Sequence, residues 1–158
     1  MARRYSLGVN AFNFIWFNFT FMNQAQLPKE RERFVKEKLW RSGHQATDVS
    51  QFSSFDILVD RKLRLEVKYA NPRAQLRGRW MLYAVSPSEF DILAVVFTAP
   101  LGFTVYFLKS KLFLKKMVNH ENYYHHNIGI TEETLKRCFT KNFSKIQIIK
   151  RKNTPLGI

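Results

Sequence analysis

The chain has 158 residues, a length that fits one ordinary domain with a buried core. Its formal net charge of +14 comes from 26 Lys and Arg against 12 Asp and Glu. Such a balance is typical of proteins that bind DNA or RNA, because basic side chains release the counterions condensed on a polyanion. The single cysteine, Cys138, excludes an internal disulfide, and no Cys/His group has the spacing of a zinc site. We therefore expect an intracellular protein in a reducing compartment. We expect no membrane partner, because no segment sets lysines opposite an apolar helical face.

Residues 1–26 differ from the rest of the chain. Arg3 and Arg4 precede an aromatic run at residues 12–19 that asparagines interrupt, and no acidic residue comes before Glu30. A basic start without acids is typical of targeting peptides, but this apolar run is short for a membrane span. A targeting segment, a strand packed on the domain and a poorly ordered leader all stay open. We expect a single domain over residues 27–158, in the cytoplasm or nucleoid, or in an organelle if the leader is a targeting segment.

A helix is predicted from Pro28 to Ser42. Proline suits the first helical turn, and Gly43 is placed to close the last one. Glu32 shares a helical face with Val35 and Leu39. Because that face should pack on the core, a carboxylate there calls for a functional reason.

Two extended runs, at residues 55–60 and 63–69, predict a β-hairpin. Asp56 stands near the start of the first run. In the second run apolar and polar residues alternate with a period of two, so Glu66 and Lys68 must project from the same face. Hairpin pairing can then bring Asp56 opposite that pair.

The rest of the chain predicts alternating strands and helices. In chain order we expect a basic loop at residues 71–78, strands at 80–85, 91–97 and 103–108, a helix from Ser110 to about Asn119, a loop at 120–129, a helix from Thr131 to about Phe139 and a late strand at 145–150. This order predicts an α/β (α+β) fold with a central mixed β-sheet flanked by helices.

Two carboxylates and an ammonium group at one place suit phosphodiester hydrolysis. The carboxylates of Asp56 and Glu66, with the main-chain carbonyl of Val67, can bind Mg²⁺, which polarises a phosphate and lowers the pKa of an attacking water. Lys68 can orient or deprotonate that water and offset the charge that gathers on phosphorus. Glu32 could reach the same place as an outer metal ligand or as a base acting through water. Mn²⁺ is the expected substitute metal.

These residues resemble the core of the PD-(D/E)xK nuclease superfamily, a helix followed by a hairpin that bears the catalytic groups. The resemblance is carried by Glu32–Gly43, Ser54–Val59, Leu65–Lys68 and Glu89–Val96. It implies catalytic positions at Glu32, Asp56, Glu66 and Lys68. A serine pair, Ser53-Ser54, stands where the superfamily's name has proline. Within the superfamily the chain resembles the small homing endonucleases of group I introns, which work as oligomers on long DNA sites.

We accordingly expect a Mg²⁺-dependent endonuclease that cuts both strands of double-stranded DNA as a homo-oligomer, either a dimer or a tetramer. A homing endonuclease is the preferred subtype, followed by a restriction enzyme or a Holliday-junction resolvase. Two other classes would also explain the charge: a non-catalytic RNA-binding or splicing factor, and a structural protein such as a ribosomal component. The carboxylates distinguish these classes, because a binding module has no need to place two carboxylates against a polyanion.

Basic residues outside the hairpin are candidates for contact with DNA phosphates. They are Arg73, Arg77, Arg79, Lys109, Lys111, Lys115 and Lys116. Other conspicuous residues receive ordinary structural interpretations. We expect His120, His125 and His126 to be exposed loop residues, Trp80 and Tyr83 to be core residues, and Asp91 to be a structural turn residue.

Overall fold

The computed structural model describes residues 27–71, 74–99, 102–122 and 125–147. The leader at residues 1–26 and Arg73 lie outside the described residues. The helices within them are α2 (Leu27–Arg41), α3 (Leu114–Met117) and α4 (Glu132–Cys138), with 3-10 turns η1 (Lys111–Phe113) and η2 (Phe143–Lys145). The strands are β1 (Ala46–Asp48), β2 (Ile57–Val59), β3 (Leu63–Ala70), β4 (Trp80–Val85), β5 (Ile92–Ala99), β6 (Gly102–Leu108), β7 (Val118–Glu121), β8 (His126–Ile130) and β9 (Phe139–Thr140).

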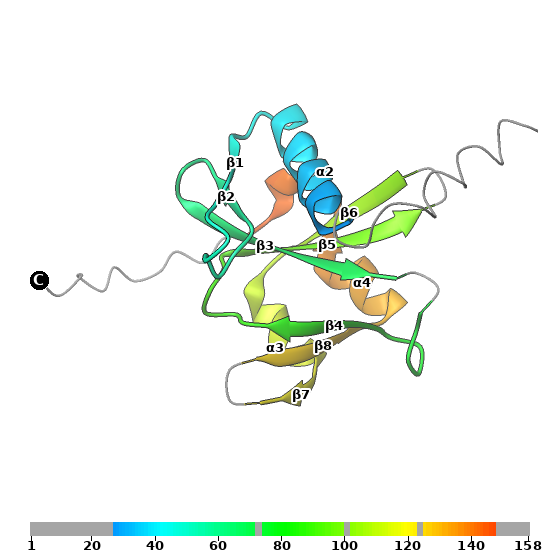
Figure 1. Cartoon of the computed structure of the whole chain (residues 1–158). Coiled ribbons are helices and arrows are strands. Elements are labelled where there is room, and N and C mark those ends of the chain that lie inside the picture. Colours follow the sequence, from blue (N-terminus) through cyan, green and yellow to red (C-terminus); the bar gives the residue numbers. More distant parts are fainter. Residues whose placement is uncertain (1–26, 72–73, 100–101, 123–124, 148–158) are drawn as a thin grey trace, which may run out of the picture.

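The central sheet is mixed. Its six strands follow the order β1-β2-β3-β5-β6-β9, in which β3 and β5 run parallel and the other neighbours run antiparallel. Strands β4, β8 and β7 form a second, antiparallel sheet. The predicted α/β (α+β) class, with a central mixed sheet flanked by helices, is therefore confirmed (Figure 1).

Each face of the central sheet has its own hydrophobic core. Helix α2 packs Val35 and Leu39 on one face, and α3, α4 and the three-stranded sheet cover the other (Figure 1). Strand β5 belongs to both cores, because successive residues of Ile92–Phe97 point to opposite faces. Burial on both faces explains why this strand has an uninterrupted apolar run, as is usual for strands with a parallel neighbour.

Local signals place the helix ends close to where the sequence predicts them. Helix α2 ends at Arg41, and Gly43 follows with a φ of +85°, a conformation that glycine adopts without steric cost. The hydroxyl of Thr131 accepts a hydrogen bond from the N–H of Thr134 at 3.0 Å and so caps α4. Among the described residues, no helix is long and apolar enough to cross a membrane.

The segment after η1 corrects two predictions. The expected helix from Ser110 to about Asn119 ends at Met117, and the expected loop at residues 120–129 is instead largely a hairpin of β7 and β8. Polar residues and Gly129 conceal strand β8 in the sequence, since only Ile128 and Ile130 supply its apolar alternation.

Two further predictions are also corrected. Residues 145–147, the described part of the expected late strand, contain no strand; β9, at the end of α4, pairs with β6 instead. Tyr83 is 62% exposed and not a core residue. Tyr83 points outward because it follows the buried Leu82 in the alternation of β4, and a register shift between Leu82 and Val85, with Ala84 at a φ of +51°, returns Val85 to the core.

Candidate active site

Asp56 extends the β2–β3 pairing by one step beyond the end of β2. Regular pairing stops where Ile57 lies opposite Leu65. The N–H of Asp56 donates to the carbonyl of Leu65 at 3.0 Å, and its Oδ2 accepts from the N–H of Val67 at 2.6 Å. The N–H and carbonyl of one strand residue point to the same edge. The Val67 carbonyl, predicted as a metal ligand, is therefore directed to the edge of β3 at which Asp56 lies.

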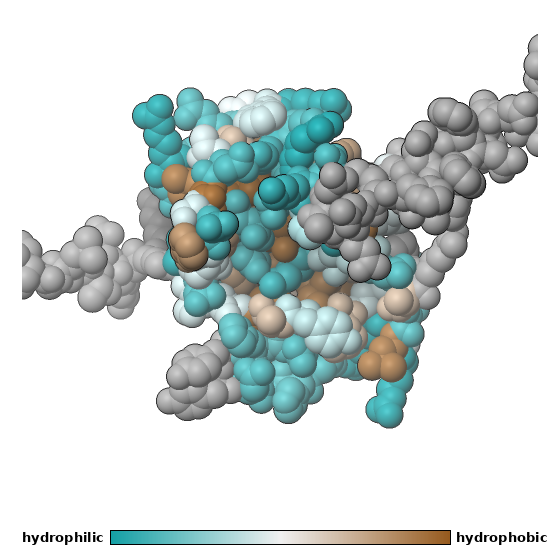
Figure 2. All heavy atoms as spheres, in the orientation of Figure 1, coloured by the Kyte–Doolittle hydropathy of each residue, from teal (hydrophilic) through white to brown (hydrophobic). Residues whose placement is uncertain are grey.

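Glu66 and Lys68 project together from β3, as their spacing predicts. Lys68 Nζ lies 2.8 Å from Glu66 Oε1, and the two side chains are 21% and 14% exposed respectively. They pair in register with Leu93 and Val95 of β5, so they share the sheet face that is covered by the three-stranded sheet. In the view of Figure 2, hydrophilic side chains lie between the layer of α2 and that sheet.

Glu32 lies in the second turn of α2 and is half-buried. Burial raises its pKa first, and the carboxylates of Asp56 and Asp48 raise it further. Lys36, one helical turn later, contacts Asp48 Oδ1 at 2.6 Å. The structure thus brings Glu32 within electrostatic range of Asp56, although it reaches the site from a different layer than β3.

The three carboxylates of this site, which we call the acidic cluster (Glu32, Asp56 and Glu66), all have raised pKa values. Burial is the largest cause for each of them. The charge of Asp56 adds to the raised pKa of Glu66, whereas Lys68 and the Val67 N–H act in the lowering direction on Asp56. The partly buried carboxylate of Asp56 raises the pKa of both Glu32 and Glu66, so the acidic cluster favours an added positive charge.

The donor set fits a magnesium ion. No group of three or more His, Cys, Asp or Glu side chains in the described ranges forms a metal cage. Mg²⁺ does not need one, because it keeps several waters and is commonly held by one or two carboxylates together with substrate phosphates. Asp56, Glu66 and the Val67 carbonyl would offer the hard oxygen ligands that such an ion prefers.

The basic candidates fall into two groups. Lys109 Nζ donates to the Arg137 carbonyl at 2.8 Å, and Lys111 Nζ donates to the Phe90 carbonyl at 2.8 Å and to the Pro87 carbonyl. These two lysines are engaged in packing the fold, and burial lowers the pKa of Lys111. The other described candidates, Arg77, Arg79, Lys115 and Lys116, are exposed.

Two acidic residues near the site were missed as candidates in the sequence. Glu89, in the turn before β5, is close enough to Glu66 to raise its pKa, and Asp48, at the end of β1, acts in the same way on Glu32. The parallel pairing of β3 with β5 brings Glu89 near Glu66. Only a prediction of that pairing could have revealed it, because the two residues are far apart in the chain.

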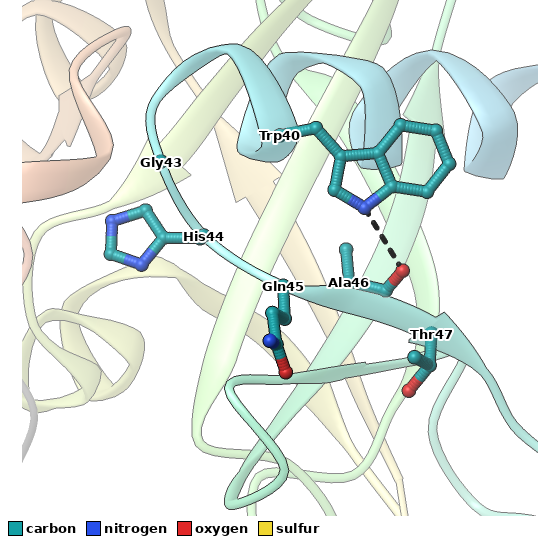
Figure 3. A pocket seen from close by; sticks show the side chains of 6 residues that line it. All are labelled: Trp40, Gly43, His44, Gln45, Ala46 and Thr47. Carbon is teal, nitrogen blue, oxygen red and sulfur yellow. Dashed lines mark hydrogen bonds between the residues drawn. The ribbon is translucent and has the colours of Figure 1, made fainter.

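His125 and a pocket beside Trp40 are two further features outside the acidic cluster. His125 Nδ1 lies 2.6 Å from Ser86 Oγ, and the backbone N–H of His125 donates to Asn122 Oδ1 at 2.7 Å. His125 therefore takes part in loop structure, and it is only partly exposed. A pocket at the C-terminal end of α2 is lined by Trp40 and by Gly43–Thr47, and the Trp40 indole donates to the Ala46 carbonyl at 3.1 Å (Figure 3). It contains no carboxylate.

No family model matches the chain, and no curated protein matches it. Among solved structures, the chain is similar to a bacterial homing endonuclease with 14% sequence identity and a TM-score of 0.40. The match covers 65% of this chain and 70% of the other. The likeness is distant, and the roles of residues in this chain follow from their own geometry.

Proposed function

We propose that the protein is a Mg²⁺-dependent endonuclease that hydrolyses phosphodiester bonds in double-stranded DNA. The observation that carries the proposal is the meeting of Asp56 with the Glu66–Lys68 pair around Val67. Half-buried carboxylates in a chain of net charge +14 would repel a polyanion unless a cation lies between them. A nuclease requires that arrangement, and a passive binding protein does not.

Each residue has a distinct role in this proposal. Asp56, Glu66 and the Val67 carbonyl would hold Mg²⁺, which when bound neutralises phosphate charge and makes water more acidic. Lys68, kept in place by Glu66, would donate a hydrogen bond to the attacking water or to a non-bridging phosphate oxygen. Glu32, with its raised pKa, would accept a proton through an intervening water.

Several finer attributes belong to the same proposal. The subtype we favour is a homing endonuclease of the PD-(D/E)xK superfamily, with a restriction enzyme or a Holliday-junction resolvase next. Since one small domain carries one such site, cutting both strands together would require a homo-oligomer, a dimer or a tetramer. Residues 27–158 would act as one nuclease domain in a reducing intracellular compartment, with Mn²⁺ as an effective substitute metal.

The test is the conversion of supercoiled plasmid into nicked and linear forms, with Mg²⁺, Mn²⁺ or EDTA. The plasmids carry a large library of inserts, so that a long recognition site is represented. Wild-type protein is compared with Lys68→Ala and with Lys62→Ala, a matched variant of the exposed lysine in the β2–β3 turn. We expect metal-dependent cutting that Lys68→Ala loses and Lys62→Ala keeps.

A second candidate function, a non-catalytic binder of DNA or RNA, is supported by the charge alone. It predicts tight binding with no cutting in any metal. Equal cutting by wild type and Lys68→Ala would reject the site assignment, even if the protein is a nuclease.

A further inference from the structure

A tight turn, Leu76–Arg79, precedes β4 and projects beyond the small sheet (Figure 1). Leu76 and Arg79 exchange both backbone hydrogen bonds, at 2.8 and 3.0 Å. The two residues between them, Arg77 and Gly78, have φ values of +50° and +73°. Positive φ at both central positions is the property of a type I′ turn, the most compact connection between two antiparallel segments.

The tip of this turn is exposed and slightly strained. Leu76 is 61% exposed, Arg77 is also exposed, and a Cβ added to Gly78 would meet nothing within 4 Å. An arginine in the left-handed region costs about 1–2 kcal/mol relative to its ordinary conformations. Asparagine or glycine at position 77 would avoid that cost, so folding alone does not account for an arginine there.

The base of the turn is firmly attached to the small sheet. Arg79 donates from Nη1 to Asn119 Oδ1 on β7. Gly129 on β8 leaves room for this contact, because a Cβ at that position would collide with the Asn119 side chain and lie 3.0 Å from Arg79 Cδ. The turn is therefore a rigid projection with one arginine and one leucine at its end.

The positive charge of the segment around the turn indicates a polyanionic partner. Residues 69–88 contain three arginines and no acidic residue, and they directly follow Lys68 of the candidate site in the chain. A single arginine beside an apolar wedge is the combination with which proteins enter the minor groove of DNA, which is too narrow for a helix. A two-residue tip of Arg77 and Gly78, with Leu76 beside it, is narrower than a helix and fits that width.

We propose that the Leu76–Arg79 turn inserts Arg77 and Leu76 into the minor groove of the duplex held at the candidate active site. The inference rests on the proposed function for the nature of the partner, and it adds a specificity contact that phosphate-binding lysines cannot supply. Arg77 reads the groove floor and Leu76 wedges against a base step.

The first experiment compares the binding of two mixed-sequence duplexes with Ca²⁺ in place of Mg²⁺, so that a cation is present at the carboxylates, and a gel checks that the duplexes stay uncut. One duplex has every dG replaced by deoxyinosine, which removes the amino group from the minor groove and leaves the major groove unchanged. Wild type should bind the inosine duplex more tightly. Arg77→Asn, which keeps the turn, should bind it about tenfold more weakly than wild type and lose the preference.

Matched variants control for charge and exposure. Arg61→Asn changes another exposed arginine at positive φ (+58°), in the β2–β3 turn, and should keep both the affinity and the inosine preference. Leu76→Gln should weaken binding severalfold without changing its salt dependence, whereas Leu112→Gln, at a residue 69% exposed, should not.

The outcomes separate this inference from the proposed function. An equal loss of affinity on both duplexes by Arg77→Asn, the same loss by Arg61→Asn, or a wild type without inosine preference would overturn the groove insertion. If the predicted binding pattern is found but the plasmids are never cut in any metal, the insertion stands and the proposed nuclease activity falls.

Discussion

Two ion pairs use the same face of strand β3: Arg64 pairs with Asp91, just before β5, and Lys68 pairs with Glu66 within the strand. The guanidinium of Arg64 donates to both carboxylate oxygens of Asp91, at 3.2 and 3.3 Å. The backbone N–H of Arg64 also donates to Asp91 Oδ2, at 2.9 Å. Its Nη2 also donates to the Ser88 carbonyl at 3.2 Å, and the N–H of Asp91 donates to the Arg64 carbonyl at 2.7 Å. This first pair ties the start of β5 to β3.

The second pair, Glu66 and Lys68, lies farther along the same strand, beyond the end of β2. Its two side chains meet at 2.8 Å, but burial and a neighbouring carboxylate raise the pKa of Glu66. A partly buried pair whose groups satisfy one another stabilises a fold, whereas one with a surplus of negative charge is suited to bind a cation. The comparison separates a structural ion pair, which joins β3 to the start of β5, from a candidate catalytic one within β3.

The largest expected difference concerns cleavage. Glu66→Gln should lower the cutting rate by roughly a thousandfold or more, because it removes a proposed metal ligand and the partner of Lys68. Asp91→Asn, the matched change in the structural pair, should leave the cutting rate per folded molecule within about threefold of wild type. Both rates are measured on supercoiled plasmid, with the folded fraction determined by circular dichroism. Similar losses in the two variants would remove the distinction between the pairs.

The free energy of unfolding should depend more on the Arg64–Asp91 pair than on the Glu66–Lys68 pair, which is the reverse of the order expected for the cutting rate. Arg64→Met leaves Asp91 partly buried without its guanidinium, and we expect the free energy of unfolding to fall by about 2–3 kcal/mol. Lys68→Met retains most of the side-chain volume at the other pair and should change that free energy by less than about 1 kcal/mol. Urea denaturation at neutral pH measures both. A larger loss for Lys68→Met than for Arg64→Met would assign the Glu66–Lys68 pair a structural role.

The pH dependence of stability tests the acidic cluster more finely. A carboxylate whose pKa is higher in the folded than in the unfolded chain makes the folded state bind more protons between the two values. The free energy of unfolding therefore falls as pH rises from the ordinary carboxyl range through the raised pKa, and stays lower above it. Asp56 has a raised pKa. Asp56→Asn should accordingly stabilise the protein at neutral pH, on the order of 1 kcal/mol, with no gain in acid.

Asp60 provides a control of opposite sign. Its hydrogen bond to His44 Nδ1 at 2.8 Å lowers its pKa, so its contribution is present above the ordinary carboxyl pKa and is lost as pH falls through the lowered one. Asp60→Asn should therefore slightly destabilise the protein at neutral pH. Urea titrations of both variants from acidic to neutral pH decide the matter. Destabilisation by Asp56→Asn at neutral pH would contradict the raised pKa of Asp56 in the acidic cluster.

The sequence predicts strand β3 of the candidate site better than it predicts the surroundings of that strand. The period-two alternation of β3 places Glu66 and Lys68 on one face without any tertiary information. The contact between Asp56 and the Val67 N–H depends on where β2 stops, and the approach of Glu89 depends on the parallel pairing of β3 and β5. Neither follows from local patterns.

In the fold as well, elements that local signals mark are predicted from the sequence, and elements without such signals are not. Strand β4 and helix α4 begin where the sequence predicts, because a clear apolar run and a capping threonine mark them. The β7–β8 hairpin was missed because polar residues outnumber the two isoleucines that β8 buries. Lys109 and Lys111 resemble surface lysines in the sequence, yet both donate to main-chain carbonyls, since long lysine side chains reach across neighbouring segments.

The smallest expected effect is on the salt dependence of DNA binding. It should distinguish the exposed lysines from the lysines that donate to main-chain carbonyls. Lys115 and Lys116 are exposed, so if either contacts a phosphate, its replacement by alanine should lower duplex affinity modestly and reduce the slope of log affinity against log salt by about one. Lys111 donates to the carbonyls of Pro87 and Phe90, so Lys111→Ala should lower the free energy of unfolding and leave the salt slope unchanged. Fluorescence anisotropy with a labelled duplex over a range of salt concentrations measures the slope, and urea denaturation measures the stability. A reduced slope for Lys111→Ala would mean that this lysine leaves its carbonyl partners when DNA binds, and would move it from the structural to the DNA-binding group.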